Sequence, residues 1–345
     1  MKMNTLYSPF TYKSLSLKNR VVMPPMCQYS VTKMDGTPND WHYTHYVSRA
    51  IGGTGLIIVE MTNVEPDGRI SNQCLGLWSE KQVPAYKRIV DGVHENGAKA
   101  AIQIAHAGRK AEDAATPVAP SAIRFDENYN EPRALTTEEV KEMVEKFRTS
   151  AKLAVQAGFD AIELHGAHGY LIHQFHSSYT NKREDEYGEL SRFGVEVVKA
   201  VKSEMPEDMP LIMRISAKEF VEEGYEIKDG IELARQYKDA GVDIFHVSAG
   251  GEGKIAPSRN PGSHEGYMIP FARAFKEALD TPIIAVGRLE DAGLANAIVG
   301  NDDADLVAVG RGMLRDPYWA IHAAHEINQD IEVPEQYSRG FAIRK

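Results

Sequence analysis

The sequence predicts a closed (β/α)₈ barrel, the TIM barrel, as a single domain spanning residues 1–345. Eight short apolar runs alternate with helix-like segments along the chain. Each run is nearly continuous in apolar residues, which is typical of a parallel sheet covered on both faces. No linker separates two domains. The rival fold, a doubly wound sheet, lacks its nucleotide fingerprint, because Gly250–Gly253 does not open a convincing helix.

The eight apolar runs are the expected strands. In chain order they are Val21–Met23, Leu56–Val59, Ala101–Ile104, Ala161–Leu164, Leu211–Ile215, Ile244–Val247, Ile283–Val286 and Leu306–Val309. Three strands are preceded by Gly97, Gly158 and Gly241, each where a helix is expected to end in a left-handed cap. The helix before Gly158 is the clearest, because Thr136 and Glu139 form a plausible capping box and apolar residues follow at helical spacing.

Composition and charge are typical of a soluble enzyme. Hydrophobic residues make up 43% of the chain and the formal net charge is −10, so we expect neither nucleic acid nor an anionic membrane surface as the main partner. No apolar run approaches the roughly 20 residues of a membrane span, and Met1–Phe10 lacks the layout of a secretory signal. The 2 cysteines supply neither a disulfide framework nor an iron–sulfur cluster. We expect a reducing, cytoplasmic compartment.

The segment His165–Leu171 is the most informative part of the chain. It follows the expected strand Ala161–Leu164 and presents two imidazoles three residues apart, with the phenol of Tyr170 two residues further on. Gly166 and Gly169 allow the backbone to turn tightly there. In a parallel barrel ligands bind at this end of the strands, so the segment predicts hydrogen-bond donors and a proton donor at one site. The alternative is one or two structural histidines that cap a loop.

Two Gly-Arg pairs follow the seventh and eighth expected strands, Gly287–Arg288 and Gly310–Arg311. Barrels commonly hold a phosphate there on backbone N–H groups, and the guanidinium of Arg311 can add a bidentate contact. Either pair alone is common in loops, but the two at matching strands favour a phosphate site. Three long segments begin at the same end of the expected strands and should form its walls: Gln28–Trp41, Arg109–Pro132 and Gly251–Tyr267.

Four segments together resemble the old yellow enzyme family of flavin-dependent ene-reductases, in particular the thermophilic-like bacterial NADPH dehydrogenases. In family order they are Pro25–Ser30, Gln103–Lys110, His165–Leu171 and Val309–Pro317, and the likeness runs from Leu17 to Phe341. The resemblance implies an FMN bound in the barrel mouth, with NADPH or NADH as electron donor. It further implies a reductase that acts on the C=C bond of small activated alkenes, the α,β-unsaturated carbonyl compounds.

The resemblance also implies a role for each residue at the strand ends. His165 and His168 would donate hydrogen bonds to the substrate carbonyl, so that its β-carbon accepts hydride from N5 of the reduced flavin. Tyr170 would then protonate the α-carbon. Arg214 would face the N1 edge of the flavin and stabilise its reduced form. The other implied flavin contacts are Pro24, Pro25, Met26, Cys27, Met61, Gln103, Gly287, Gly310 and Arg311.

Four further residues have an implied role, and three of them also have a plainer interpretation. The resemblance places Cys27 beside the flavin as a tuning residue, although most free cysteines are small buried hydrophobes. Tyr29 and Lys110 would line the substrate pocket, although a loop lysine is usually just solvated. Arg339 would reach into the active site of a neighbouring subunit, which implies a homodimer or homotetramer, although a terminal surface charge is the simpler reading.

Two other functions stay open, and the chain departs from the family in two places. A flavin-free lyase or isomerase would need a Schiff-base lysine or converging metal ligands; the candidates are only Lys218 and Glu163, and we expect no metal. A non-catalytic flavin-binding barrel has no need of an acid such as Tyr170. The loop after Gly188 is shorter than in the family, which bears on the substrate range more than on flavin binding. Pro24 stands where the family often has a small hydroxyl residue, which removes one expected hydrogen bond to the flavin.

Overall fold

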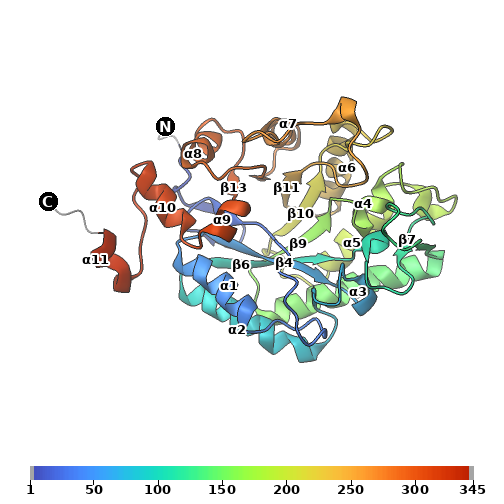
Figure 1. The fold of residues 1–345 in the computed structure, drawn as a ribbon, viewed down its shortest axis with the longest axis horizontal. Helices are drawn as coiled ribbons and strands as arrows, with labels where there is room; N and C mark the ends of the chain where they lie inside the picture. Colours follow the sequence, from blue (N-terminus) through green and yellow to red (C-terminus); the bar gives the residue numbers. More distant parts are fainter. Residues whose placement is uncertain (1–3, 342–345) are drawn as a thin grey trace.

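Eight parallel strands close into a barrel that is surrounded by helices (Figure 1). The computed structural model describes residues 4–341. In spatial order the barrel strands are β3 (Val21–Met23), β4 (Leu56–Asn63), β6 (Lys99–Ala105), β9 (Ala161–Gly166), β10 (Leu211–Ser216), β11 (Ile244–Ser248), β12 (Ile283–Ala285) and β13 (Leu306–Ala308). β13 pairs with β3 and closes the ring. The predicted (β/α)₈ barrel and all eight expected strands are confirmed.

Helices follow most strands and pack outside the ring. They are α1 (Asp40–Ile51), α2 (Val83–Glu95), α3 (Thr137–Ala157), α4 (Leu171–His176), α5 (Arg192–Lys202), α6 (Ile227–Ala240), α7 (Ile269–Leu279), α8 (Ala292–Gly300), α9 (Arg311–Arg315), α10 (Trp319–Glu326) and α11 (Ser338–Phe341). Helix α3 begins at the expected capping box of Thr136 and Glu139. It ends at Gly158, whose φ of 89° is left-handed as predicted.

The apolar core has two parts. The larger part lies between the strands and the surrounding helices. The smaller part fills the barrel interior, with members such as Ile58 and Ile212. A hairpin of β1 (Phe10–Tyr12) and β2 (Leu15–Leu17) packs Phe10, Leu15 and Leu17 into this interior cluster and so covers the N-terminal end of the ring. The sequence did not predict the hairpin, because three-residue strands are too short to show alternation.

The long segments lie at the opposite end of the ring, where the strands terminate. The segments after β3, β6 and β11 are the three that the sequence indicated. Two short pairings occur at this end. β5 (Leu75–Gly76), in the segment after β4, pairs with the end of β4, and β7 (Val118–Ala119) pairs with β8 (Arg133–Ala134) within and just beyond the segment after β6. No helix within residues 4–341 is long and apolar enough to cross a membrane.

Candidate active site

A cavity of about 300 Å³ lies at the carboxyl ends of the barrel strands. Three guanidinium groups line it, those of Arg214, Arg288 and Arg311, against one carboxylate, Glu290. Arg214 Nε is buried and has no hydrogen-bond partner among the described residues. Such a site suits a ligand that carries an anionic group and further acceptors. The remaining lining residues are Pro24, Pro25, Met26, His168, Ser248, Tyr267, Met268, Val286, Gly287, Ala308 and Gly310.

Most residues that the sequence assigned to the flavin lie in this cavity. They are Pro24, Pro25, Met26, Arg214, Gly287, Gly310 and Arg311. The other three lie beside it rather than in its wall. Met61 and Cys27 pack in an apolar cluster that Tyr170 also touches. Gln103 on β6 donates from Nε2 to Glu163 Oε1 at 2.8 Å, which leaves its amide oxygen as the atom available to a ligand. The residues present therefore fit a flavin with a phosphate tail.

His165, His168 and Tyr170 converge at the edge of the cavity. The rings of His165 and His168 are 5.1 Å apart between centroids, and those of His165 and Tyr170 are 4.7 Å apart, both in edge-to-face contact. His165 stands on β9, and the other two stand on the turn that leads into α4. The structure thus brings the predicted set together, as the placement at a strand end indicated.

The turn that carries His168 has an unusual backbone. His168 and Gly169 are both left-handed, with φ of 60° and 73°, a conformation that costs a non-glycine residue roughly 1–2 kcal/mol. A hydrogen bond to Ser216 Oγ holds His168 N at 3.1 Å, and Lys110 Nζ donates to His168 O at 3.0 Å. Gly169 has no room for a side chain, because a Cβ there would lie 2.4 Å from Gly251 O. The turn is fixed by its neighbours.

The side chains of His165, His168 and Tyr170 are uncharged, and each can donate a hydrogen bond. Burial, reinforced by the charge of Arg214, holds the pKa of both His165 and His168 well below the ordinary 6.5. His165 Nδ1 accepts from Ala167 N at 3.3 Å, so its proton is on Nε2. His168 Nε2 lies 2.7 Å from Ser248 Oγ. Burial raises the pKa of Tyr170 well above 10, which keeps the phenol protonated.

Of the predicted substrate-pocket residues, Lys110 lies against Tyr170, whereas Arg339 lies elsewhere. Lys110 Nζ is 5.0 Å from the centre of the Tyr170 ring, and burial lowers the pKa of Lys110 to about 8. Tyr29 is 47% exposed, on the long segment after β3. Arg339 is exposed on α11 at the periphery of the molecule (Figure 1), so it does not line the cavity of its own chain.

The sequence analysis missed a polar network inside the barrel. His246 on β11 is fully buried, and its Nδ1 lies 2.8 Å from Glu163 Oε2. Glu163 thereby links His246 to Gln103, beneath the cavity. The available signal was a histidine and a glutamate within otherwise apolar strand runs, since a buried polar group needs a partner.

A second missed neighbour is Cys74. Its thiol lies near that of Cys27, and both pack in the cluster that Tyr170 touches. The neighbouring thiol of Cys27 and the hydrogen bonds with Ser71 lower the pKa of Cys74 to about 7 despite its burial. Nothing in the sequence pairs these two residues, which stand in separate loops.

Comparisons with known proteins identify the family of the chain. Residues 5–330 match the NADH:flavin oxidoreductase / NADH oxidase family. An NADPH dehydrogenase of Listeria monocytogenes serotype 4a (strain HCC23) is 48% identical over 343 residues, which cover 98% of this chain and 100% of that protein. Among solved structures, morphinone reductase has a TM-score of 0.80 and 28% identity, covering 97% of this chain and 92% of that one.

A longer protein shares the same barrel. The 2-naphthoyl-CoA reductase structure, solved with 2-naphthoyl-CoA, matches with a TM-score of 0.87 and 25% identity over 93% of this chain. This chain spans about half of that protein, 52% of its length. The family match and the nearly full-length relative confirm the resemblance read from the sequence, and with it the FMN cofactor and the nicotinamide electron donor. The chain belongs to the NADH:flavin oxidoreductase / NADH oxidase family, the old yellow enzyme family, and is an FMN-dependent oxidoreductase.

Proposed function

We propose that this enzyme is an ene-reductase that uses electrons from NADPH or NADH to reduce the activated C=C bond of α,β-unsaturated carbonyl compounds. When bound, FMN supplies the chemistry of accepting two electrons from a nicotinamide and returning them as hydride. The observation that carries the proposal is the convergence of His165, His168 and Tyr170 at the edge of the cationic cavity. A protein that only stores flavin needs no such set.

The two imidazoles act on the carbonyl oxygen of the substrate. His165 presents Nε2–H, because its Nδ1 accepts from the backbone. With the Ser248 hydroxyl as donor to His168 Nε2, the proton of neutral His168 is on Nδ1. Two neutral donors draw electron density from the alkene as negative charge develops on oxygen, and one such donor is typically worth roughly 10²–10³ in rate.

Tyr170 supplies the proton that completes the reduction. Its phenol stays protonated because burial raises its pKa, and the partner carbon is a strong base once hydride has arrived. Lys110 lies against the same ring and also holds the carbonyl of His168. It therefore orders the acid and the turn beside it, and Tyr29 closes the outer side of the substrate pocket.

The cavity residues hold the cofactor. The guanidinium of Arg214 would face the flavin ring, and the backbone of Gly287 and Gly310 with the side chain of Arg311 would hold the phosphate. We further propose a homodimer or homotetramer in the cytoplasm, in which Arg339 completes the active site of a neighbouring subunit. The exposure of Arg339 on a peripheral helix supports this arrangement.

The test is the Tyr170→Phe variant, followed through each half-reaction by rapid mixing under anaerobic conditions. NADPH should reduce the bound flavin at the rate of the unmodified enzyme, whereas reoxidation by 2-cyclohexenone should slow by roughly 10²–10⁴, the usual effect of losing a general acid. Tyr129→Phe is the matched control, because this nearby phenol bonds to Glu112 instead. Equal loss in both half-reactions, or unchanged reoxidation, would refute the acid role.

A further inference from the structure

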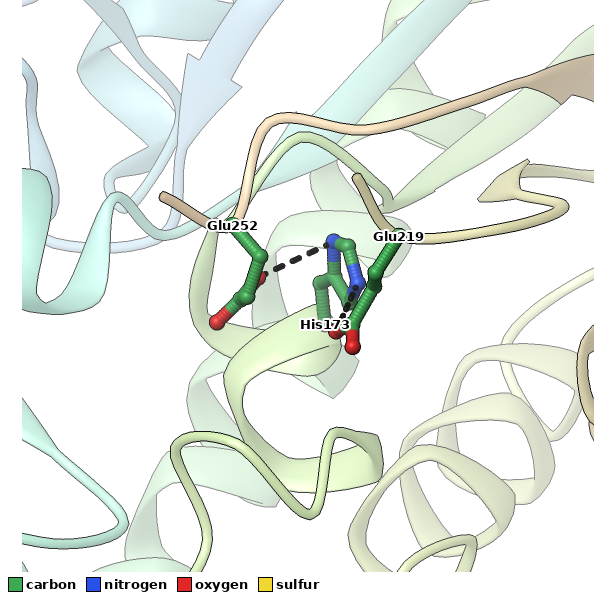
Figure 2. A group of neighbouring side chains, drawn as sticks. All are labelled: His173, Glu219 and Glu252. Atoms are coloured by element: carbon green, nitrogen blue, oxygen red, sulfur yellow. Dashed lines mark hydrogen bonds and ion pairs between the residues drawn. The ribbon is translucent and has the colours of Figure 1, made fainter. Parts of the chain in front are cut away.

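A buried group of ionisable side chains lies directly behind the turn of His168 and Gly169 (Figure 2). His173 comes from α4, Glu219 follows β10, and Glu252 follows β11. All three side chains are fully buried. Figure 2 shows the two carboxylates on opposite sides of the imidazole, one facing each ring nitrogen. None of the three has a role in the function proposed above.

The hydrogen bonds of this group assign the imidazole a neutral state and leave one carboxylate oxygen unsatisfied. His173 Nδ1 accepts from Gly169 N at 2.9 Å, and His173 Nε2 lies 3.1 Å from Glu219 Oε1. The proton is therefore on Nε2. Glu252 Oε2 lies 3.2 Å from Nδ1, yet it has no donor among the described residues. A buried carboxylate oxygen without a donor is costly.

A proton satisfies this oxygen better than a metal ion does. Ligand atoms of the three side chains lie within 4.8 Å of one another, which is close enough to suggest a cation site. The two carboxylates, however, face different ring nitrogens, whose lone pairs point away from each other. A single ion on one nitrogen would leave the opposite carboxylate poorly placed. Protonation of Nδ1 instead gives Glu252 its missing donor.

We propose that His173 is a positioning residue that couples protonation to the catalytic turn. In the neutral state, Nδ1 accepts from Gly169 N–H and holds the turn. In the imidazolium state, Nδ1–H donates to Glu252, so Gly169 N–H loses its acceptor and the turn is released. The inference rests on the proposed function, because it matters to catalysis only if His168 and Tyr170 act on substrate.

The surrounding charges set the balance between the two states. Burial and the nearby Lys110 oppose the imidazolium, but Glu252 and the hydrogen bond to Glu219 outweigh them and raise the pKa of His173. Arg109 faces the group from the segment after β6, with its Nη2 3.5 Å from Glu252 Oε1.

Two further titratable groups contact the imidazole. Tyr225 Oη lies 3.3 Å from Nε2, and the ring of His176 is 4.9 Å away between centroids. Burial keeps the pKa of His176 well below its ordinary value, so it does not compete for the proton of His173. The two states of His173 therefore exchange at a pH above the ordinary pKa of an imidazole.

Release of Gly169 would loosen a turn that is otherwise held at a few points. Gln174 Nε2 still donates to Gly169 O at 2.7 Å, and Ser216 still holds His168 N. We therefore expect acid to weaken the binding of carbonyl substrates, raising KM for an enone more than it lowers kcat. Reduction of the flavin by NADPH should change less, since it does not need Tyr170.

The experiment is ¹⁵N NMR of the FMN-loaded enzyme labelled at histidine and glycine, with His173→Gln and Gly169→Ala to assign the two sets of signals. Nδ1 of His173 should change from an acceptor to a protonated nitrogen as pH falls, and the amide of Gly169 should titrate with the same midpoint. In Glu252→Gln that midpoint should move to roughly tenfold or more higher proton concentration, and the acid limb of kcat/KM for 2-cyclohexenone should move with it.

The matched control is His176→Gln, another buried imidazole on α4, whose Nδ1 bonds to Tyr237 Oη at 2.9 Å rather than to the turn. It should leave both midpoints in place.

A Gly169 amide that does not follow His173 in the unmodified enzyme overturns the inference, even if Glu252→Gln fails to fold. So does a Zn²⁺ titration that shifts the His173 signals at micromolar metal. If the NMR result holds while Tyr170→Phe reoxidises normally, the proposed function fails and the switch survives.

Discussion

Replacing Glu60 with glutamine should change how the stability of this protein depends on pH. Glu60 is fully buried on β4. Its carboxylate accepts from Gln28 N at 2.7 Å and from Tyr46 Oη at 2.9 Å, so it fixes the segment that carries Cys27. Burial outweighs these hydrogen bonds and raises its pKa from 4.5 to about 8.

The sign and size of the effect follow from linkage. Because the folded pKa lies above the unfolded value, the folded state retains the proton while the unfolded chain releases it. Stability is therefore full below the unfolded pKa and is lost as pH rises toward the folded one. Between about pH 5 and about pH 9 the loss amounts to about 4 kcal/mol. For a chain of 345 residues this is about 5 °C in Tm.

The assay is thermal unfolding of both FMN-loaded proteins across that pH range. The amide of Glu60→Gln does not ionise, so its Tm relative to the unmodified protein should rise by about 5 °C from the acid to the alkaline end. Glu139→Gln is the control, because the hydrogen bond from Arg133 lowers the pKa of Glu139 to about 2 and its difference should stay constant over the range. Parallel curves for Glu60→Gln would refute the reasoning.

Three further substitutions test the site. Gly169→Ala places a Cβ 2.4 Å from Gly251 O, so enone turnover should fall roughly tenfold while the flavin content stays unchanged. The Tm should fall as well, because the left-handed backbone costs an alanine about 1 kcal/mol. Ser248→Ala removes the partner of His168 Nε2 at 2.7 Å, and steady-state kinetics should show KM for the enone raised roughly fivefold, the usual value of one hydrogen bond. Arg214→Met removes a cation from the cavity wall, and potentiometric titration should show the flavin potential lowered by roughly 30 mV or more.

The strands could be predicted because their burial on both faces leaves a plain mark in the sequence. Runs such as Ile244–Val247 have few polar residues, and Gly158 marks a helix end that only a left-handed residue fits. The same logic placed His165, His168 and Tyr170 together, since a parallel barrel brings its strand ends to one mouth. The hairpin formed by residues 10–17 escaped prediction because its stabilising contacts are with the barrel interior rather than within its own short strands.

The polar contacts of the site could not be predicted in the same way. Cys27 and Cys74, or His173 and Glu252, are far apart in the chain and meet only once the barrel closes. No periodicity encodes such pairs, because each depends on the path of a long irregular loop. The sequence therefore identified which residues reach the mouth of the barrel, but not which of them bond to one another.

The hairpin at the N-terminal end of the barrel determines how the donor and the acceptor enter and leave the enzyme. Phe10, Leu15 and Leu17 close the N-terminal end of the ring. Under the proposed function, the nicotinamide donor and the alkene acceptor must therefore both enter at the opposite end. The donor and the acceptor cannot occupy that end of the barrel together, so each must leave before the other binds. An excess of either the donor or the acceptor should therefore inhibit binding of the other.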